Sequence, residues 1–386
     1  MSQPTTEPAN GDVAYFNQIL KAGVDAGCSD VHIKVGTPAS YRISRAFHSI
    51  DFVPTQVWMQ SVIDGICPKH MKAGLEADRE TDFSYSAPGV GRFRTNVFQA
   101  LGRWCIVMRY IKATVPSFEK LGLPEILKTV AESPRGIVLM AGTTGSGKST
   151  TLAAMLEHLN NNFRKHIVTL EDPIEFVFEE NQCLIEQREL NLDTMSFHRA
   201  MKSALREDPD VIMVGEMRDA ISFQTSISAA DTGHTVISTM HTTSANSSVG
   251  RILEYFKQDE RDTIRRQLAG TLRSVCCQRM MPTADGGMRP ALEIMINTIS
   301  IRKAIEENQL GKLLPIIEGS RKIVETDGIS LWEDQGEGMM SFNQCIYNLL
   351  QQGIITEERA MEKASNPQQL KMWLEGIFTS SGGITG

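Results

Sequence analysis

A glycine-rich segment that ends in a lysine and a serine is the clearest site of chemistry in this sequence. Its spacing matches the pattern G-x-x-x-x-G-K-[ST], in which backbone N–H groups surround phosphates. We expect the lysine to neutralise β/γ-phosphate charge and the serine hydroxyl to bind Mg²⁺, so the segment predicts an ATP site. This segment, called the phosphate loop below, consists of Gly142, Thr143, Thr144, Gly145, Ser146, Gly147, Lys148 and Ser149. We also count the next residue, Thr150, among the nucleotide-binding residues.

Hydrolysis of ATP also needs a group that orients or deprotonates water. Glu216 directly follows the sequence Val-Gly and is our candidate for this base. The strand that precedes it does not end in the aspartate that usually assists the metal, so this task falls to Glu171 or Asp172. The candidate metal ligands are therefore Ser149, Glu171 and Glu216, with Asp172 as the alternative carboxylate.

Three further polar residues are candidates for contact with the nucleotide. His241 follows an apolar run and lies where that strand should meet the γ-phosphate, which favours a sensor or relay role. His234 precedes the same run and is as consistent with a structural role as with nucleotide binding. Glu175 is either a surface charge or a polar group at the site.

Alternating apolar and helix-length segments must position these residues. Such alternation predicts an α/β fold with a mainly parallel sheet that is covered by helices. Ligands of such sheets bind beyond the carboxyl ends of the strands, so the polar residues after each run should converge. The four runs are 137–140, 167–170, 211–214 and 236–240.

A smaller α/β domain is predicted before this sheet. Helical spacing covers 13–27, alternation at Val31, Ile33 and Val35 indicates a strand, and further strands are expected around 83–85, 93–98 and 104–111. The segment 114–124 breaks the pattern with Pro and Gly, and the chain from 258 onward is expected to be mostly helical. The predicted organisation is a disordered tail 1–12, a first domain 13–115, a linker 116–124, a second α/β domain with carboxyl-terminal helices 125–378 and a disordered tail 379–386.

Composition restricts the classes of function. The chain has 386 residues, of which 41% are hydrophobic, and 39 basic against 46 acidic residues give a net charge of −7, which argues against nucleic acid as a partner. The seven cysteines have neither disulfide nor zinc spacing and are expected to be reduced. Without a signal peptide or a membrane-span pattern, we expect a cytoplasmic protein, with peripheral membrane association left open.

Four sequence boxes together resemble the secretion-ATPase superfamily of P-loop motors, and within it the type IV pilus retraction ATPases. The resemblance covers roughly residues 13–376. The boxes are Walker A at 142–149, the Asp box Leu-Glu-Asp-Pro-Ile-Glu at 170–175, Walker B Val-Gly-Glu-Met-Arg-Asp at 214–219, and the His box at 232–241. A Gly-Glu Walker B followed by such a His box is typical of this superfamily.

The resemblance implies a PAS-like amino-terminal domain joined to a RecA-like P-loop ATPase domain, assembled as a homo-hexamer. It implies that Arg94 and Arg109, which match family positions, reach the phosphates when a subunit closes. A guanidinium at that place stabilises transition-state charge, whereas the alternative is an exposed ion pair. The implied function is pilus retraction. The implied partners are an inner-membrane platform protein and a paralogous retraction ATPase, at the cytoplasmic side of the inner membrane.

Some segments depart from the family pattern and leave alternatives open. A carboxyl-terminal helix motif linked to retraction reads Ser-Ile-Arg-Lys-Ala-Ile-Glu-Glu at 300–307, a turn that is usually Asp-Gly or Asn-Gly is Ser44-Arg45, and 318–338 is longer than the corresponding loop. An accessory retraction ATPase is the nearest alternative. A pilus assembly or type II secretion ATPase is less favoured because an additional amino-terminal domain and a four-cysteine site are missing. A nucleotide-gated binding module that does not hydrolyse ATP is the alternative from another class.

Overall fold

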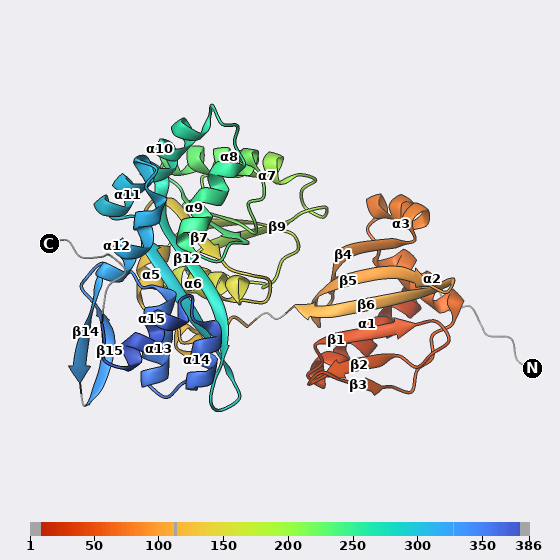
Figure 1. Cartoon of the computed structure of the whole chain (residues 1–386). Helices are drawn as coiled ribbons and strands as arrows, with labels where there is room; N and C mark the ends of the chain where they lie inside the picture. Colours follow the sequence, from red (N-terminus) through yellow and green to blue (C-terminus); the bar gives the residue numbers. More distant parts are fainter. Residues whose placement is uncertain (1–8, 112–113, 327, 379–386) are drawn as a thin grey trace, which may run out of the picture. The chain divides into compact units, whose positions relative to one another are not determined.

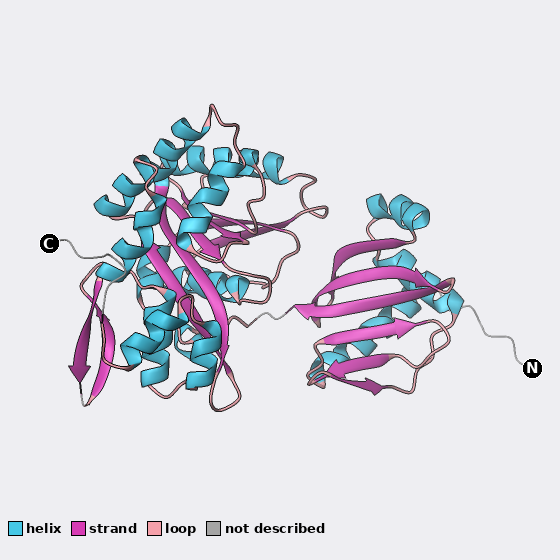
Figure 2. Cartoon of the chain, in the orientation of Figure 1, coloured by secondary structure: helices cyan, strands magenta, loops and turns pink. Residues whose placement is uncertain are grey.

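The computed structural model describes residues 9–111, 114–326 and 328–378. The chain divides into two compact units (Figures 1 and 2). Residues 1–114 form the first unit together with 171–179 and 188–196, and the remaining residues form the second. The expected tail 379–386 and residues 1–8 of the expected tail 1–12 lie outside the described residues. For residues 9–12 the prediction of a tail is wrong, because the first helix begins at Ala9.

The first unit contains a six-stranded antiparallel sheet with the strand order β3-β2-β1-β6-β5-β4. Its helices are α1 (Ala9–Asp25), α2 (Gln56–Ile66) and α3 (Lys72–Asp78), with a short 3-10 turn at Lys69–Met71. Every strand that the sequence predicted here is present. The strands are β1 (Asp30–Lys34), β2 (Ser40–Ile43), β3 (Ala46–Ser49), β4 (Glu80–Ala87), β5 (Gly91–Ala100) and β6 (Arg103–Ile111).

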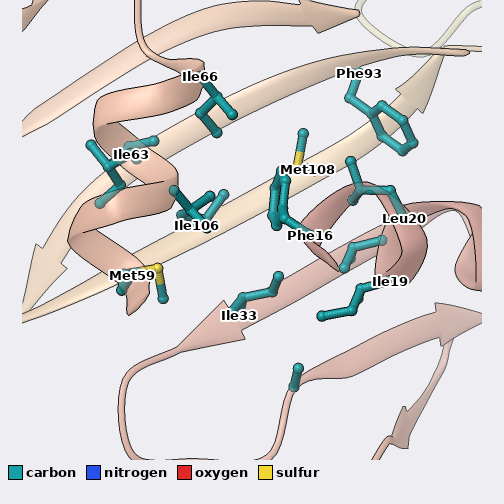
Figure 3. Close-up of a cluster of buried hydrophobic side chains, with 14 of the residues drawn as sticks. Phe16, Ile19, Leu20, Ile33, Met59, Ile63, Ile66, Phe93, Ile106 and Met108 are labelled. Atoms are coloured by element: carbon teal, nitrogen blue, oxygen red, sulfur yellow. The ribbon is translucent and has the colours of Figure 1, made fainter. Parts of the chain in front are cut away.

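Apolar side chains of α1 and α2 pack against one face of this sheet (Figure 3). In α1 they recur at helical spacing, and in the strands they alternate, so each element presents one apolar face. Burying them removes apolar surface from water, which is the main stabilising contribution to such a core. The central residues are Phe16, Leu20, Ile33, Met59, Ile63, Phe93, Ile106 and Met108.

The turn between β2 and β3 is unusual because a serine and an arginine occupy its two positive-φ positions. Ser44 has φ 48° and Arg45 has φ 71°. A two-residue hairpin of this kind normally uses Asn-Gly or Asp-Gly, since those residues tolerate the left-handed region. The chain therefore keeps the backbone geometry of the turn although the usual residues are replaced.

The second unit contains the predicted mainly parallel sheet, with the strand order β13-β12-β7-β11-β10-β8-β9. β12, β7, β11, β10 and β8 are parallel neighbours, and β13 is antiparallel to β12. The four predicted apolar runs form the buried β7, β8, β10 and β11. The strands are β7 (Gly136–Ala141), β8 (His166–Glu171), β9 (Leu184–Glu189), β10 (Val211–Val214), β11 (Thr235–Met240), β12 (Leu272–Pro282) and β13 (Met288–Ile296).

Helices cover this sheet and extend beyond it. Several begin at a Ser, Thr, Asp or Asn whose side chain accepts a hydrogen bond from the first turn, as at Asp219, Ser244 and Ser341. The helices are α4 (Phe118–Leu121), α5 (Ile126–Ala131), α6 (Lys148–Asn162), α7 (Phe197–Ala204), α8 (Ala220–Asp231), α9 (Ala245–Glu254), α10 (Arg261–Thr271), α11 (Ile299–Glu306), α12 (Leu313–Gly319), α13 (Phe342–Gln351), α14 (Glu357–Lys363) and α15 (Pro367–Leu374).

The expectation of a mostly helical chain after residue 258 is wrong. The long hairpin of β12 and β13 lies in this region and adds two strands to the main sheet. A second hairpin, β14 (Arg321–Thr326) with β15 (Ile329–Asp334), forms a separate two-stranded sheet within the 318–338 segment. Both pairs were missed because polar residues interrupt their apolar runs.

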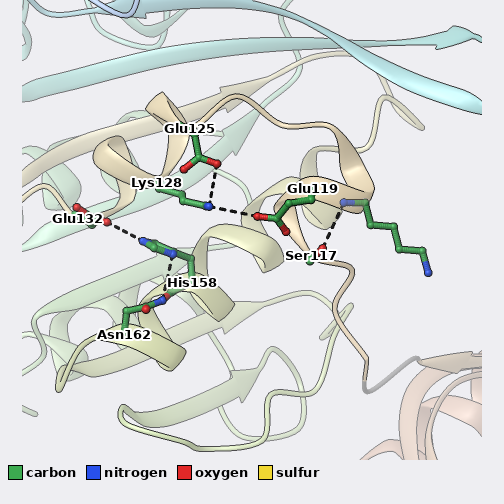
Figure 4. Close-up of polar contacts among 8 residues, drawn as sticks. Ser117, Glu119, Glu125, Lys128, Glu132, His158 and Asn162 are labelled. Atoms are coloured by element: carbon green, nitrogen blue, oxygen red, sulfur yellow. Dashed lines mark hydrogen bonds and ion pairs between the residues drawn. The ribbon is translucent and has the colours of Figure 1, made fainter. Parts of the chain in front are cut away.

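The segment 116–124, which we expected to be a linker, contains helix α4. Phe118 and Leu123 are buried there, and the segment belongs to the second unit, which begins at Val115. Figure 4 shows the polar contacts nearby, where Lys128 Nζ lies 3.4 Å from a Glu119 carboxylate oxygen and 2.9 Å from one of Glu125. Exposed ion pairs contribute little to stability, so the two apolar side chains account for most of the attachment of α4.

No helix among the residues that the structure describes is both long and apolar enough to cross a membrane.

Candidate functional site

The phosphate loop connects the buried strand β7 to helix α6. Gly142, Gly145 and Gly147 all have positive φ, of 151°, 77° and 87°. Gly147 is the N-cap residue of α6, which begins at Lys148. Backbone N–H groups and the positive end of the helix dipole therefore meet at the loop, which is the arrangement that binds phosphate.

Two of these glycines lie against a neighbouring strand. A Cβ atom at Gly142 would lie 2.5 Å from the backbone oxygen of Gln278, and one at Gly147 would lie 2.7 Å from Gln278 Nε2. Larger residues would have to displace β12 or leave the loop conformation. The loop is thus held in shape from the side of β12.

Lys148 is almost fully buried at the loop, with 8% of its surface exposed. Its Nζ donates to the carbonyl oxygens of Gly142, at 2.7 Å, and Thr143, at 3.1 Å. Burial lowers the pKa of Lys148, and the charge of Glu216 partly offsets this effect. A triphosphate beside this ammonium group would add the negative charge that its surroundings lack.

Ser146 and Ser149 of the loop, and Thr150 directly after it, are the other residues here that we predicted to contact the nucleotide. The Oγ of Ser146 is buried and has no hydrogen-bond partner among the described residues, while Ser149 is exposed in the first turn of α6. No cluster of three His, Cys, Asp or Glu side chains that could hold a metal occurs in the described ranges. The site fits Mg²⁺ held by Ser149 together with phosphate oxygens, because Mg²⁺ often takes few protein ligands.

Glu216 lies just beyond the carboxyl end of β10. Gly215 before it is fixed on both sides, since its N–H donates to Leu170 O at 2.7 Å and its carbonyl accepts from Thr239 Oγ1 at 2.6 Å. The Glu216 carboxylate lies 3.3 Å from His241 Nε2 and 2.7 Å from Arg218 Nη2.

The predicted pair Glu216 and His241 is therefore brought together, from adjacent strands. Arg218 was not predicted as a site residue, although it lies within the Walker B box.

The environment of Glu216 keeps its carboxyl group ionised. Desolvation is the largest influence and raises its pKa, but the hydrogen bond from Arg218 and the charges of His241 and Arg218 together lower it below the usual value. Glu216 is thus a carboxylate at neutral pH. It can accept a hydrogen bond or a proton from water.

The end of β11 lies beside the phosphate loop. The N–H of Gly142 donates to Met240 O, at 3.2 Å, and His241 is the next residue after Met240. His241 is 47% exposed on its side chain, so its ring is accessible. Because β10, β11 and β7 are parallel neighbours, their carboxyl ends meet, and this places the loop, Glu216 and His241 at one edge of the sheet.

His234 lies at the opposite end of β11. The six residues of β11 separate it from His241, which corresponds to about 20 Å along an extended strand. Its Nδ1 lies 3.0 Å from Ala229 O and 3.1 Å from Thr232 Oγ1, at the turn after α8. The structure does not bring His234 to the phosphate loop of its own chain, and its contacts are those of a residue that fixes a turn.

The three carboxylates of the Asp box lie in a segment, 171–179, that groups with the first unit. Glu171 is buried, and its Oε2 accepts a hydrogen bond from the Glu175 N–H at 3.3 Å. Asp172 and Glu175 are exposed. Glu171 at the end of β8 is therefore held by its own segment, whereas the side chain of Asp172 is exposed.

Arg94 and Arg109 face each other on the adjacent strands β5 and β6 of the first unit. Both are exposed, and Arg109 Nε donates to Asp30 Oδ1 at 2.9 Å. Desolvation is the largest influence on Asp30 and raises its pKa, but the hydrogen bonds from Ser29 and Arg109 lower it overall. Arg109 is therefore oriented by an ion pair, and the two cationic groups are accessible from the same sheet face.

An ion pair between a half-buried arginine and a buried glutamate of the first unit was not predicted from the sequence. Arg92 Nη2 lies 2.8 Å from Glu189 Oε2, and the Ser84 hydroxyl donates to the same oxygen at 2.8 Å. The Ile174 N–H also donates to it, at 3.1 Å. Glu189 therefore fixes the Asp-box segment within this unit. Arg92 lies in the sequence Gly-Arg-Phe-Arg at 91–94 and Glu189 in Gln-Arg-Glu at 187–189, and no local pattern there indicates that the two side chains pair.

Comparison with known proteins agrees with this geometry. Residues 78–332 match the family described as Type II/IV secretion system protein. The chain is 40% identical to the type IV pilus retraction ATPase PilT of Pseudomonas aeruginosa, over 92% of this chain and 99% of that protein. It is 33% identical to the type IV pilus ATPase PilU of the same organism, over 93% and 91% of the two chains.

A solved structure is also similar over nearly the full length. The crystal structure of the pilus retraction motor PilT with bound ADP matches with a TM-score of 0.82 and 36% identity, covering 92% of this chain and 98% of that one.

Proposed function

Because this chain belongs to the Type II/IV secretion system protein family, we propose that it is an ATP-hydrolysing motor that powers the retraction of type IV pili. The observation that carries the proposal is the pairing of an intact phosphate loop with a carboxylate and a histidine on neighbouring strand ends. The 40% identity to a named retraction ATPase over nearly the whole chain supports the same function.

In the proposed reaction, the phosphate loop binds the triphosphate and Glu216 acts on the attacking water. Lys148 neutralises β/γ-phosphate charge, and backbone N–H groups of the loop orient the phosphates. The water oxygen bonds to the γ-phosphorus while Glu216 accepts a proton from that water. The bond from the γ-phosphorus to the bridging oxygen breaks, which releases ADP and phosphate. The lowered pKa of Glu216 makes it a weak base that is better suited to orienting the water than to deprotonating it early. This agrees with the loose transition state of phosphoryl transfer, in which the bond to the attacking oxygen is little formed.

Mg²⁺, when bound, would neutralise developing charge on the phosphates. Ser149 is the protein ligand that the loop offers, with Glu171, Asp172 or Glu216 acting through water. His241 is proposed as the group that senses the γ-phosphate, because it touches Glu216 and follows the strand that adjoins the loop.

Arg94 and Arg109 remain proposed contacts of the nucleotide phosphates, on the basis of the family resemblance. Their exposure in the first unit leaves both guanidinium groups accessible. Arginine suits this role since it stays charged and binds phosphate oxygens through two donors.

We propose the same setting for the motor as the resemblance implies. The chain would act as a homo-hexamer at the cytoplasmic side of the inner membrane, against a platform protein of the pilus machine. A paralogous retraction ATPase would be a second partner, as the similarity to both PilT and PilU suggests.

An accessory retraction ATPase is the second candidate function. It is supported by the 33% identity to PilU over 93% of the chain. It is also supported by Glu306 in the 300–307 motif, at a position where the retraction family carries a basic residue. A strain that lacks the gene separates the possibilities when its surface pili are counted. Accumulated pili support a role in retraction, and bald cells support a role in assembly. If pili accumulate but overproduction of the paralogue restores their normal number, the accessory role is supported.

A further inference from the structure

One buried glutamine of β12 contacts both the phosphate loop and the first turns of the helix that follows it. Gln278 is 2% exposed. Its Nε2 donates to Ser146 O at 2.8 Å, and its Oε1 accepts from Thr151 Oγ1 at 2.8 Å. We infer that Gln278 is a positioning residue, which sets the direction of a phosphate-binding N–H group of the loop.

The sheet register brings Gln278 to this place. β12 runs parallel to β7, and Cys277 is paired with Ala141, the last residue of β7. Gln278 therefore lies beside Gly142, where the loop begins. The backbone of Gln278 lies against Gly142, and its side chain lies against Gly147. A Cβ atom at either glycine would collide with Gln278, so the strand and the loop are tightly packed.

The direction of the loop's N–H groups follows from peptide geometry. The carbonyl of Ser146 and the N–H of Gly147 belong to one planar trans peptide group, so they point in opposite directions. When Gln278 holds the Ser146 carbonyl toward β12, the Gly147 N–H must point away from β12. Donation to that carbonyl also polarises the peptide group and strengthens the N–H as a donor.

The carboxamide of Gln278 satisfies both contacts at once. The Ser146 carbonyl needs a donor and the Thr151 hydroxyl needs an acceptor, and glutamine supplies one of each. Leucine would fill a similar volume without either bond. An ionised glutamate would oppose the Ser146 carbonyl and put negative charge near the phosphates. The requirement thus lies in the two hydrogen bonds and not in burial alone.

This inference depends on the phosphate loop being the nucleotide site, as proposed above. The test is the affinity of the full-length protein for ADP, measured by calorimetric titration, together with the KM and kcat of ATP hydrolysis. For Gln278→Leu we expect a Kd for ADP about tenfold higher, from the loss of an oriented donor. KM should rise similarly with kcat little changed, because the N–H binds substrate and transition state alike.

Gln344 offers a matched control. It is a fully buried glutamine in α13, whose amide donates to Glu318 O at 2.9 Å and accepts from the Ser341 N–H at 3.0 Å. Gln344→Leu should lower the thermal stability as Gln278→Leu does, while the Kd for ADP stays within twofold of the wild type. A merely structural role of Gln278 would make the two variants alike in ADP affinity.

Thr151→Val is a smaller change at the same contact and keeps the test decisive if Gln278→Leu does not fold. It should raise the Kd for ADP several-fold, and the double variant should lose less than the sum of the two single losses. ADP binding within twofold of the wild type by folded Gln278→Leu, or by Thr151→Val alone if Gln278→Leu does not fold, would overturn the inference. Failure of the wild type to bind ADP would instead overturn the proposed nucleotide site.

Discussion

Glu216 Oε2 and His241 Nε2 lie 3.3 Å apart, each just beyond the carboxyl end of its strand. β10 and β11 are adjacent and parallel, so the two side chains are neighbours in space although 24 residues of chain, 217–240, lie between them. The contact links the residue proposed to act on water with the residue proposed to sense the γ-phosphate.

Glu216→Gln should retain nucleotide binding and lose turnover. The amide keeps the shape of the side chain but cannot take a proton, so we expect kcat to fall by at least about 100-fold. The Kd for ADP, measured by titration, should change little. Glu254→Gln, at an exposed glutamate of α9, is the matched control and should hydrolyse ATP normally. Normal hydrolysis by Glu216→Gln would remove Glu216 from the proposed role.

Lys148→Ala should weaken ADP binding. The ammonium group of Lys148 lies within the phosphate loop, where it can donate a charged hydrogen bond to a phosphate oxygen. Loss of such a bond should raise the Kd for ADP roughly 10- to 100-fold. Lys371→Ala, at an exposed lysine of α15, controls for the loss of one positive charge. An unchanged affinity of Lys148→Ala would undermine the assignment of the loop.

The sequence predicts those residues of the site that directly follow an apolar run of the parallel sheet. The phosphate loop, Glu216 and His241 each follow a short apolar run, and parallel strands bring such positions to one edge. The same rule predicts that His234 lies at the opposite edge of the sheet, because His234 precedes the apolar run of β11 and His241 follows it.

The fold was predictable to the same degree. The buried strands β7, β8, β10 and β11 were found, whereas β12 was not, since Arg273, Gln278 and Arg279 interrupt its apolar pattern. The contact of Gln278 with the loop depends on register between strands that are more than 130 residues apart in sequence, and no local pattern encodes it.

Glu293→Gln should alter how stability depends on pH. Burial raises the pKa of Glu293, although the Ala245 N–H, 2.8 Å from Oε1, and the Arg279 charge lower it in part. The folded protein therefore holds this proton more tightly than the unfolded chain does. As the pH rises from about 4.5 through the raised pKa, the wild type loses stability relative to the variant.

Urea unfolding across this pH range measures the difference in unfolding free energy between the two proteins. Glu254→Gln again serves as the control, and its difference from the wild type should lack this fall. A wild-type advantage over Glu293→Gln that grows with pH would contradict the sign of the shift.

The cysteines should resist modification in the folded protein. All seven are free and buried, and burial raises the pKa of Cys276 to about 12. Since the thiolate is the reactive form, a thiol reagent at neutral pH should label none of them quickly. All seven should react once the protein is unfolded in guanidinium chloride. Rapid labelling of two or more cysteines in the native protein would show that the packing described for them is incorrect.

Ring assembly is expected in the presence of nucleotide. Light scattering at micromolar protein with ATP should give the mass of about six chains, each of 42.8 kDa. The Glu216→Gln variant is the useful sample, because it should hold ATP without consuming it. A monomer under these conditions would count against the motor.

The most direct measurement is the number of surface pili on cells whose chromosomal copy of the gene has been replaced. A strain that carries the wild-type chain should retract its pili and show few of them. A strain that carries Glu216→Gln, produced at the same level, should accumulate pili as a deletion strain does, because hydrolysis at this site drives retraction. Few pili and normal twitching in the Glu216→Gln strain would contradict the account.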